Sequence, residues 1–212
     1  MIKVLICDDH AIIRQGLKQI LADVPDLEIA AEASDGASAL QHVRAGGIDV
    51  VLLDIALPHR DGLDVLKQLR QEHPSVPVLI LSTYPEKQYA VRCLKLGAAG
   101  YLNKGAEQAE LVSAIRKVSR GGIHVSAAIA ESLAMALRHA SAGAPHEELS
   151  SREYQVFAMI AAGQTLTQIA KQLCLSLNTV STYRGRVLEK IAVSNDVELA
   201  LYAVRHQLVE LS

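Results

Sequence analysis

The sequence contains no tryptophan, one phenylalanine and three cysteines in 212 residues. Cys7, Cys93 and Cys174 are far apart and lack the paired spacing of a metal site, which argues against a disulfide framework and favours a reducing compartment. No apolar stretch reaches the ~18 residues of a membrane-spanning helix, and the amino-terminus does not have the pattern of a signal peptide. The formal net charge of −2 gives no overall tendency toward nucleic acid. Together these absences predict a cytoplasmic protein without a membrane partner.

Half of the residues are hydrophobic and most of these are aliphatic, which favours packing of helices and sheet around at least one sizeable core. In the first half, short β-branched runs alternate with longer segments of helical period. This alternation predicts an α/β fold with a doubly wound, five-stranded parallel sheet covered by helices on both faces. We expect strands at residues 3–7, 27–33, 50–54, 78–82 and 100–102, and helices at 12–21, 62–71 and 109–118.

After Gly121 and Gly122 the pattern changes. Residues 126–139 have the composition of an Ala-rich helix, and 140–148 form a stretch of small residues with a proline, which is typical of a linker. From residue 149 onward there are only helical segments, at 151–162, 167–174, 178–191 and 196–206. The chain is therefore predicted to have an α/β domain over 1–121, a linker with a helix over 122–148, and a four-helix, all-α domain over 149–212.

Polar side chains follow four of the predicted strands. Asp8 and Asp9 follow the first, Asp54 the third, Ser82 the fourth and Lys104 the fifth. A single aspartate after a strand is more often a helix cap, but the carboxyl ends of parallel strands meet at one edge, where such sheets bind ligands. Three carboxylates there repel one another unless a cation such as Mg²⁺ offsets their charge. Because a carboxylate can also accept a phosphoryl group, the combination predicts a metal-dependent phosphoryl site.

The helical half contains two segments, 167–174 and 178–191, joined by a short turn, which is the length pattern of a helix-turn-helix. The second segment is amphipathic, and we expect Val180, Val187 and Ile191 to face inward. Between Lys171 and Lys190 there are four basic residues and one acidic residue. Such a strip is either a solvated face or a DNA-binding surface, and the residues alone leave both alternatives open.

The first 120 residues resemble the receiver domain of two-component response regulators, a CheY-like fold. The matching motifs are Cys7-Asp8-Asp9-His10, Leu53-Asp54-Ile55-Ala56-Leu57-Pro58, Asp61-Gly62, Leu81-Ser82 and Gly97-Ala98-Ala99-Gly100-Tyr101-Leu102-Asn103-Lys104. The resemblance implies that a sensor histidine kinase phosphorylates Asp54. It also implies that Asp9 binds Mg²⁺ directly, that Asp8 helps through water, and that Asp54 and the backbone carbonyl of Ala56 complete the protein ligands.

The same resemblance assigns Ser82 and Tyr101 to a switch pair, in which the hydroxyl moves to the phosphate and the ring turns inward, while Lys104 contacts the phosphoryl oxygens. From the residues alone, Tyr101 is a half-buried strand aromatic. Lys104 is followed by Gly105 instead of the proline of many receivers, so no cis-proline bond is expected there. Tyr84 raises a separate hypothesis, that its ring shields the acyl phosphate from water; the alternative is local packing.

Residues 149–209 resemble the LuxR-type helix-turn-helix of the NarL/FixJ response regulators, closest in appearance to the GacA/UvrY branch. The matching motifs include Leu149-Ser150-Ser151-Arg152-Glu153, Ile169-Ala170 and Asn178-Thr179-Val180. Together the two resemblances imply a transcription factor that is controlled by phosphorylation and binds double-stranded DNA as a homodimer.

The resemblance makes residues 178–190, beginning at Asn178, the recognition helix in the major groove. Base-edge positions are implied for Ser181, Thr182, Gly185 and Arg186. Phosphate contacts are implied for Ser176, Thr179, Arg184 and Lys190. Many relatives carry lysine and histidine where this chain has Ser181 and Tyr183, so we expect a shallower salt dependence of DNA binding.

The last helical segment, 196–206, presents Val197, Leu201 and Val204 at helical spacing, with Ala200 on the same face. This face is either a core stripe or, as the resemblance implies, the surface through which two helical domains pair on DNA. Both interpretations stay open at this point.

Two other functions deserve comparison. A phosphatase of the haloacid-dehalogenase kind would use Asp54 as nucleophile, but it needs a second aspartate two residues later, where Ala56 stands. The chain is therefore expected not to be an enzyme. A phosphorelay or protein-binding module, whose helical tail contacts protein instead of DNA, is the second alternative.

Overall fold

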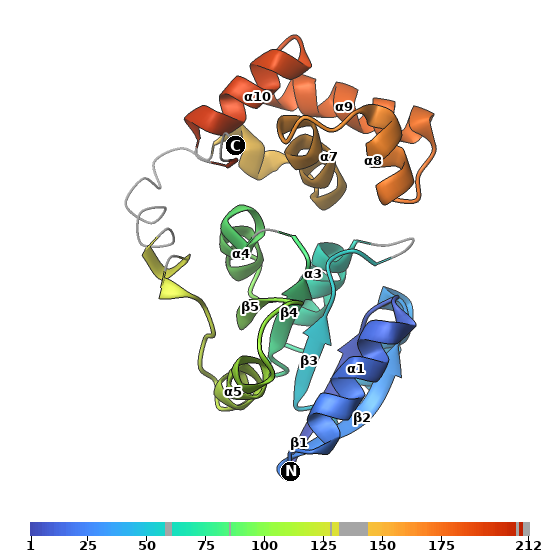
Figure 1. Ribbon diagram of the computed structural model, residues 1–212, viewed down its shortest axis with the longest axis vertical. Helices are drawn as coiled ribbons and strands as arrows, with labels where there is room; N and C mark the ends of the chain where they lie inside the picture. Colours follow the sequence, from blue (N-terminus) through green and yellow to red (C-terminus); the bar gives the residue numbers. More distant parts are fainter. Residues whose placement is uncertain (58–60, 85, 128, 132–143, 207, 210–212) are drawn as a thin grey trace. The chain divides into compact units, whose positions relative to one another are not determined.

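The computed structural model describes residues 1–57, 61–84, 86–127, 129–131, 144–206 and 208–209 (Figure 1). The chain divides into two compact units, Met1–Ala134 and Met135–Ser212. The Ala-rich helix predicted over 126–139 lies largely outside the described residues, and so does the first part of the predicted linker over 140–148. The predicted domain boundaries at 121/122 and 148/149 therefore stay predictions.

The first unit contains a five-stranded parallel sheet in the order β2-β1-β3-β4-β5. Its strands are β1 (Ile2–Cys7), β2 (Leu27–Ala33), β3 (Val50–Leu53), β4 (Val78–Ser82) and β5 (Gly100–Asn103). The prediction of a five-stranded parallel sheet is confirmed, with strand ends within one residue of those expected. β3 ends at Leu53, so Asp54 lies just past the strand and not within it.

The helices of this unit alternate with the strands, as predicted. They are α1 (Ala11–Ala22), α2 (Gly36–Ala45), α3 (Gly62–Glu72), α4 (Glu86–Lys95) and α5 (Gln108–Ser119). Asp61 caps α3, because its side chain accepts a hydrogen bond from the backbone N–H of Leu63 at 2.8 Å. A Cβ at Gly62 would collide with the backbone of Asp54 and Ile55. Glycine at this position therefore lets α3 begin directly against the segment that carries Asp54.

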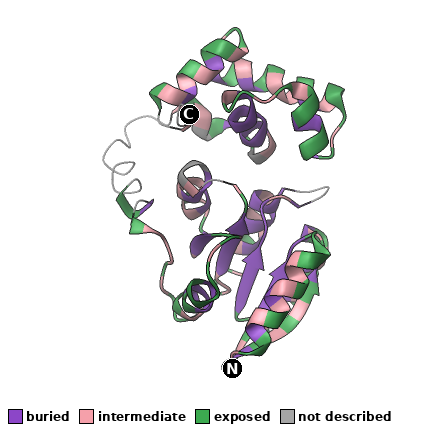
Figure 2. Cartoon of the chain, in the orientation of Figure 1, coloured by how far each residue is buried: buried purple, intermediate pink, exposed green. Residues whose placement is uncertain are grey.

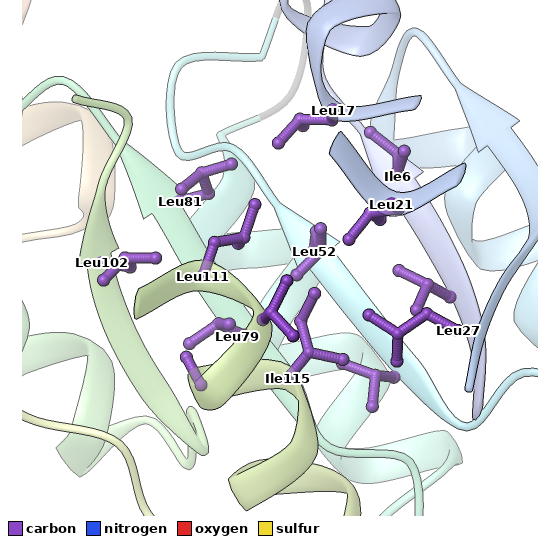
Figure 3. Packing of buried hydrophobic residues seen from close by; sticks show 14 of the residues in the cluster. Ile6, Leu17, Leu21, Leu27, Leu52, Leu79, Leu81, Leu102, Leu111 and Ile115 are labelled. Atoms are coloured by element: carbon purple, nitrogen blue, oxygen red, sulfur yellow. The ribbon is translucent and has the colours of Figure 1, made fainter. Parts of the chain in front are cut away.

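The core of the unit follows from the alternation of side chains along each strand. Val4, Ile6, Leu52 and Leu79 pack on one face of the sheet, against α1 and α5, as Figure 3 shows for Leu17, Leu21, Leu111 and Ile115. The intervening residues, such as Leu5, Val51 and Ile80, are also fully buried and point to the other face. Both faces are covered, which explains why Figure 2 shows the central strands buried along their length.

The second unit is helical over its described residues, with no strand in 144–206. It comprises a short 3-10 helix, η1 (Pro145–Glu148), and the helices α7 (Ser151–Ala161), α8 (Leu166–Gln172), α9 (Leu177–Ile191) and α10 (Asp196–Arg205). α7 packs against α9 and α10 around the buried Phe157, Val187 and Leu199. This arrangement confirms the predicted four-helix, all-α domain. Across the described parts of both units, every helix is too short or too polar to span a bilayer.

Candidate functional site

The carboxyl edge of the sheet brings together the polar side chains that follow its strands. Backbone hydrogen bonds fix this edge: the Asp54 N–H donates to the Cys7 carbonyl at 2.9 Å, and the Lys104 N–H donates to the Ser82 carbonyl at 2.9 Å. Each bond extends the pairing of two neighbouring strands by one residue. The polar side chains are therefore held by the ends of the ladder and not by a long loop.

Lys104 is the centre of this cluster. Its Nζ lies 2.6 Å from Asp8 Oδ2 and 2.7 Å from Asp54 Oδ2, and the lysine side chain is only 7% exposed. Burial raises the pKa of the Asp54 carboxyl above its usual value, although the Lys104 ammonium opposes the shift. Burial alone would lower the pKa of Lys104, but the carboxylates of Asp54 and Asp8 raise it. The lysine therefore stays charged between two buried acids.

The acidic residues also form a set that can hold a metal ion. One ligand atom each from Asp8, Asp9, His10 and Asp54 lies within 4.8 Å of the others. Lys104 offsets only one of the three carboxylate charges, so the set suits a divalent cation that prefers oxygen ligands, such as Mg²⁺. The fourth predicted ligand is the backbone carbonyl of Ala56, two residues after Asp54. The N–H of Ala56 donates a hydrogen bond to Asp54 Oδ1 at 3.2 Å. The donor set thus fits the predicted ion.

His10 was not predicted as part of this set. Its Nδ1 lies 2.7 Å from Asp9 Oδ1, and its side chain is largely exposed. The only signal in the sequence is that His10 directly follows the acidic pair.

Ser82 and Tyr101 are linked through the backbone of Tyr84. The Tyr84 N–H donates to Ser82 Oγ at 3.1 Å, and the Tyr101 hydroxyl donates to the Tyr84 carbonyl at 2.8 Å. Tyr101 is only 1% exposed, so the expectation of a half-buried aromatic was wrong. Burial also raises the pKa of its hydroxyl. Its ring points inward, and it acts as a neutral hydrogen-bond donor.

The Tyr84 ring stacks on Tyr89 of α4, with ring centroids 4.7 Å apart and planes inclined by 18°. Tyr89 is fully buried. This stacking is the local packing that was the alternative to phosphate shielding. Shielding of the acyl phosphate stays a hypothesis.

In the second unit, α8 and α9 form the predicted helix-turn-helix. The chain turns at Cys174, which has a left-handed backbone (φ 54°), and the Leu175 N–H donates to the Ala170 carbonyl at 2.9 Å. Ser176 then caps α9 by accepting from the Thr179 N–H at 3.1 Å. As predicted, Val180, Val187 and Ile191 are buried on the inner side of α9.

The other side of α9 is open to solvent. The exposed residues include most of the predicted DNA contacts: Ser176, Asn178, Ser181, Thr182, Gly185, Arg186 and Lys190. Thr179 and Arg184 are partly buried. The exposed side of α9 is thus mostly polar, and an α-helix is an element that a DNA major groove admits.

Two of the predicted phosphate contacts form ion pairs within the unit. Arg184 Nε lies 2.7 Å from Asp196 Oδ1 at the start of α10. Lys190 Nζ lies 2.7 Å from Glu153 Oε2 in the first turn of α7. The sequence did not predict either ion pair, because each joins residues of different helices.

α10 has two apolar faces. Leu199 and Ala203 are buried, whereas Val197 is 71% and Leu201 is 50% exposed. The core-stripe interpretation was therefore wrong for Val197 and Leu201, whereas Ala200 and Val204 of the same predicted face are half-buried. Val197 and Leu201 form an exposed apolar surface, here called the α10 face.

Comparisons with known proteins agree with this division. Residues 4–116 match the family described as response regulator receiver domain. Residues 147–203 match the family described as bacterial regulatory proteins, luxR family. The two matched ranges fall in the two compact units.

Whole-length relatives share both parts. The chain is 41% identical to the response regulator GacA of Pseudomonas syringae pv. syringae over 213 residues, which covers 100% of each chain. It is 37% identical to the response regulator UvrY of Escherichia coli (strain K12), over 98% of this chain and 96% of that protein. Among solved structures, the RcsB response regulator of Salmonella typhimurium is similar, with 25% identity, a TM-score of 0.57 and coverage of 96% and 98% of the two chains.

Proposed function

Because this chain belongs to the LuxR-type response regulators, we propose that a sensor histidine kinase phosphorylates Asp54 and so controls binding of the helical unit to double-stranded DNA. A receiver joined to a LuxR-type unit makes the chain a phosphorylation-dependent transcription regulator. The observation that carries the proposal for Asp54 is the buried Lys104 ammonium, which is shared between Asp54 and Asp8.

Phosphoryl transfer follows from this arrangement. A carboxylate oxygen of Asp54 forms a bond to phosphorus while the P–N bond of the kinase phosphohistidine breaks, and the imidazole nitrogen keeps the electron pair. Lys104 then exchanges its contact with Asp54 for a contact with the new phosphoryl oxygens. Because Lys104 is charged and buried, it stabilises the developing negative charge without first leaving water.

The acidic set would hold Mg²⁺ through Asp8, Asp9, Asp54 and the carbonyl of Ala56. The ion, when bound, supplies positive charge next to the phosphoryl oxygens. The match to the receiver family and the cluster of Asp8, Asp9 and Asp54 support this assignment.

Ser82 and Tyr101 would report phosphorylation to the surface of the receiver. The Ser82 hydroxyl can accept from Tyr84 only while it stays in its present position. When it turns toward the phosphoryl group, that bond is lost, and the Tyr84 segment, which also holds the Tyr101 hydroxyl, adopts a new arrangement. Phosphate can shift this equilibrium because it contacts the two arrangements differently.

The output is binding of α9 in the major groove. We assign contacts with base edges to Ser181, Thr182, Gly185 and Arg186. We assign contacts with the DNA sugar–phosphate backbone to Ser176, Asn178, Thr179 and Arg184. Surface ion pairs such as that of Arg184 and Asp196 are weak, about 0–1 kcal/mol, so Arg184 can exchange Asp196 for a DNA phosphate.

The α10 face, with Val197 and Leu201 exposed, would pair two copies on a two-fold site. We also infer a cytoplasmic location, as expected for a DNA-binding regulator of the luxR family.

Turnover of an external substrate is not part of this function. Ala56 stands two residues after Asp54 and has no carboxylate that could act as general acid.

The decisive experiment is genome-wide recovery of DNA bound to the wild-type protein and to Asp54→Ala, each with and without the activating kinase. We expect kinase-dependent enrichment of specific fragments with the wild type only. An undiminished kinase-dependent gain in Asp54→Ala would refute the assigned switch, and retention of a protein partner without any DNA would favour the protein-binding alternative.

A further inference from the structure

Lys190 lies in the last turn of α9, at the end of the helix that we assign to the major groove. Its Nζ donates to Glu153 Oε2 at 2.7 Å and to the backbone carbonyl of Glu148 at 3.4 Å. Glu153 belongs to the first turn of α7, and Glu148 is the last residue of η1. One ammonium group therefore connects the end of α9 to two segments that precede it by about 40 residues in the sequence.

Glu153 is a well-defined partner for this ammonium. Its side chain is 4% exposed, and the same Oε2 atom accepts the backbone N–H of Ser150 at 2.7 Å. The Ser150 hydroxyl in turn accepts the Glu153 N–H, which completes a capping box at the start of α7. Burial alone would raise the pKa of Glu153, but the bonds from Lys190 and Ser150 hold it below its usual value. The carboxylate is thus ionised and fixed in place.

Glu153 depends on the lysine for its charge balance. A Lys190 that turned toward a DNA phosphate would leave the buried Glu153 carboxylate without its cation. The lysine side chain is itself 38% exposed, so the loss is more costly than that of a surface ion pair and less costly than that of a fully buried one. A DNA phosphate is itself an anion, so it cannot replace the positive charge that Glu153 would lose.

We propose that Lys190 is a positioning residue: it fixes the end of the recognition helix onto the capping box of α7 and the end of η1, and it does not contact phosphate. The proposal rests on the proposed DNA-binding function of the helical unit. Lys190 and Arg186 are both exposed residues of α9, but among the described residues only Lys190 of the two makes an ion pair. Arg186 is a cation on the same helix and serves as the control for substitutions of Lys190.

The first test measures, without DNA, how far Lys190 stabilises the contact between the end of α9 and the start of α7. Hydrogen–deuterium exchange is compared in the full-length wild type, Lys190→Met, Glu153→Gln and the double variant. Lys190→Met should speed exchange of the amides in the last turn of α9 and the first turn of α7 by about tenfold or more. In the Glu153→Gln background the same substitution should have little further effect, because the buried charge has already been removed. Unchanged exchange in Lys190→Met would overturn the proposal.

The second test uses a random-sequence duplex of about 30 base pairs and measures the dependence of affinity on salt. Each phosphate contact contributes about 0.9 to the slope of log K against log salt concentration. Arg186→Met should lower this slope by about that amount, whereas Lys190→Met should weaken binding several-fold at every salt concentration and leave the slope unchanged. A fall of about 0.9 with Lys190→Met would show a phosphate contact and overturn the proposal.

Two safeguards keep the outcomes distinct. Where Lys190→Met does not fold, Lys190→Gln replaces it in the salt test, since its amide can still donate to Glu153 but carries no charge for a phosphate. If the wild-type protein fails to bind the duplex, the DNA-binding function fails, but the exchange experiment still decides whether Lys190 tethers the helix.

Discussion

Asp54 carries its negative charge at a position where burial makes that charge costly. Its pKa is raised in the folded protein, so this group stabilises the fold fully only below its ordinary pKa near 3.8, and that stability is lost as the pH rises through the higher folded value. Asp54→Asn should therefore raise the stability of the receiver unit at pH 7.5, on the order of 1 kcal/mol, because it removes a costly buried charge while Lys104 keeps Asp8 as its partner. Urea unfolding between pH 4 and 8 measures this difference, which should shrink toward acidic pH.

The matched control for this prediction is Asp64→Asn, because Asp64 lies partly exposed on α3. It should change stability by less than about 0.5 kcal/mol at every pH. Equal stability of wild type and Asp54→Asn at pH 7.5 would show that Lys104 fully compensates the buried charge.

At this scale, the sequence predicted which residues meet but not how deeply they are buried. Asp8, Asp54 and Lys104 converge because parallel strands end at one edge, and a strand pattern is enough to show that. The burial of Tyr101 depends on α4, which packs over β5. Alternation along a strand gives the face of a side chain and not what covers it. His10 was missed because its position depends on the conformation of the loop after β1. The roles assigned to these residues remain predictions.

Among the secondary-structure elements, α10 offers the clearest test of the proposed pairing. Leu201 is half exposed on the α10 face, so Leu201→Asp should leave the helical unit folded and prevent two copies from associating on DNA. Sedimentation of the phosphorylated protein with a recovered genomic fragment distinguishes one bound copy from two. Undiminished pairing of Leu201→Asp would show that another surface joins the copies.

Leu199→Ala is the control on the buried side of the same helix. Leu199 is fully buried, so this substitution should cost about 2–5 kcal/mol of unfolding free energy. If both substitutions destabilised the unit equally, the α10 face would belong to the core.

α10 also shows why the sequence could not choose between the two interpretations of this helix. Its period places Val197 and Leu201 on one side and Leu199 and Ala203 on the other, and both sides are apolar. Only the packing of α7 against α10 decides which side is buried. In α9 the opposite side is polar, and there the predicted inner residues Val180, Val187 and Ile191 were confirmed.

For the whole molecule, the fold class and the family were predictable because both halves carry long, ordered motifs. The five-stranded parallel sheet, the helical unit and the resemblance to the GacA/UvrY branch are confirmed. The coupling between the two units is different in kind. It is a free-energy difference between states, and no motif or single arrangement contains it.

Thermodynamic reciprocity makes this coupling measurable. If beryllofluoride, which mimics a phosphoryl group, binds at Asp54 and raises DNA affinity by about 5- to 150-fold, DNA must raise the affinity for beryllofluoride by the same factor. Calorimetric titration of beryllofluoride with Mg²⁺, with and without a recovered genomic duplex, measures that factor independently of any kinase. Asp54→Ala should bind the duplex with the same affinity in the presence and in the absence of beryllofluoride. If the duplex left the beryllofluoride affinity of the wild type unchanged, phosphorylation could not control DNA binding through an equilibrium between two states of the chain.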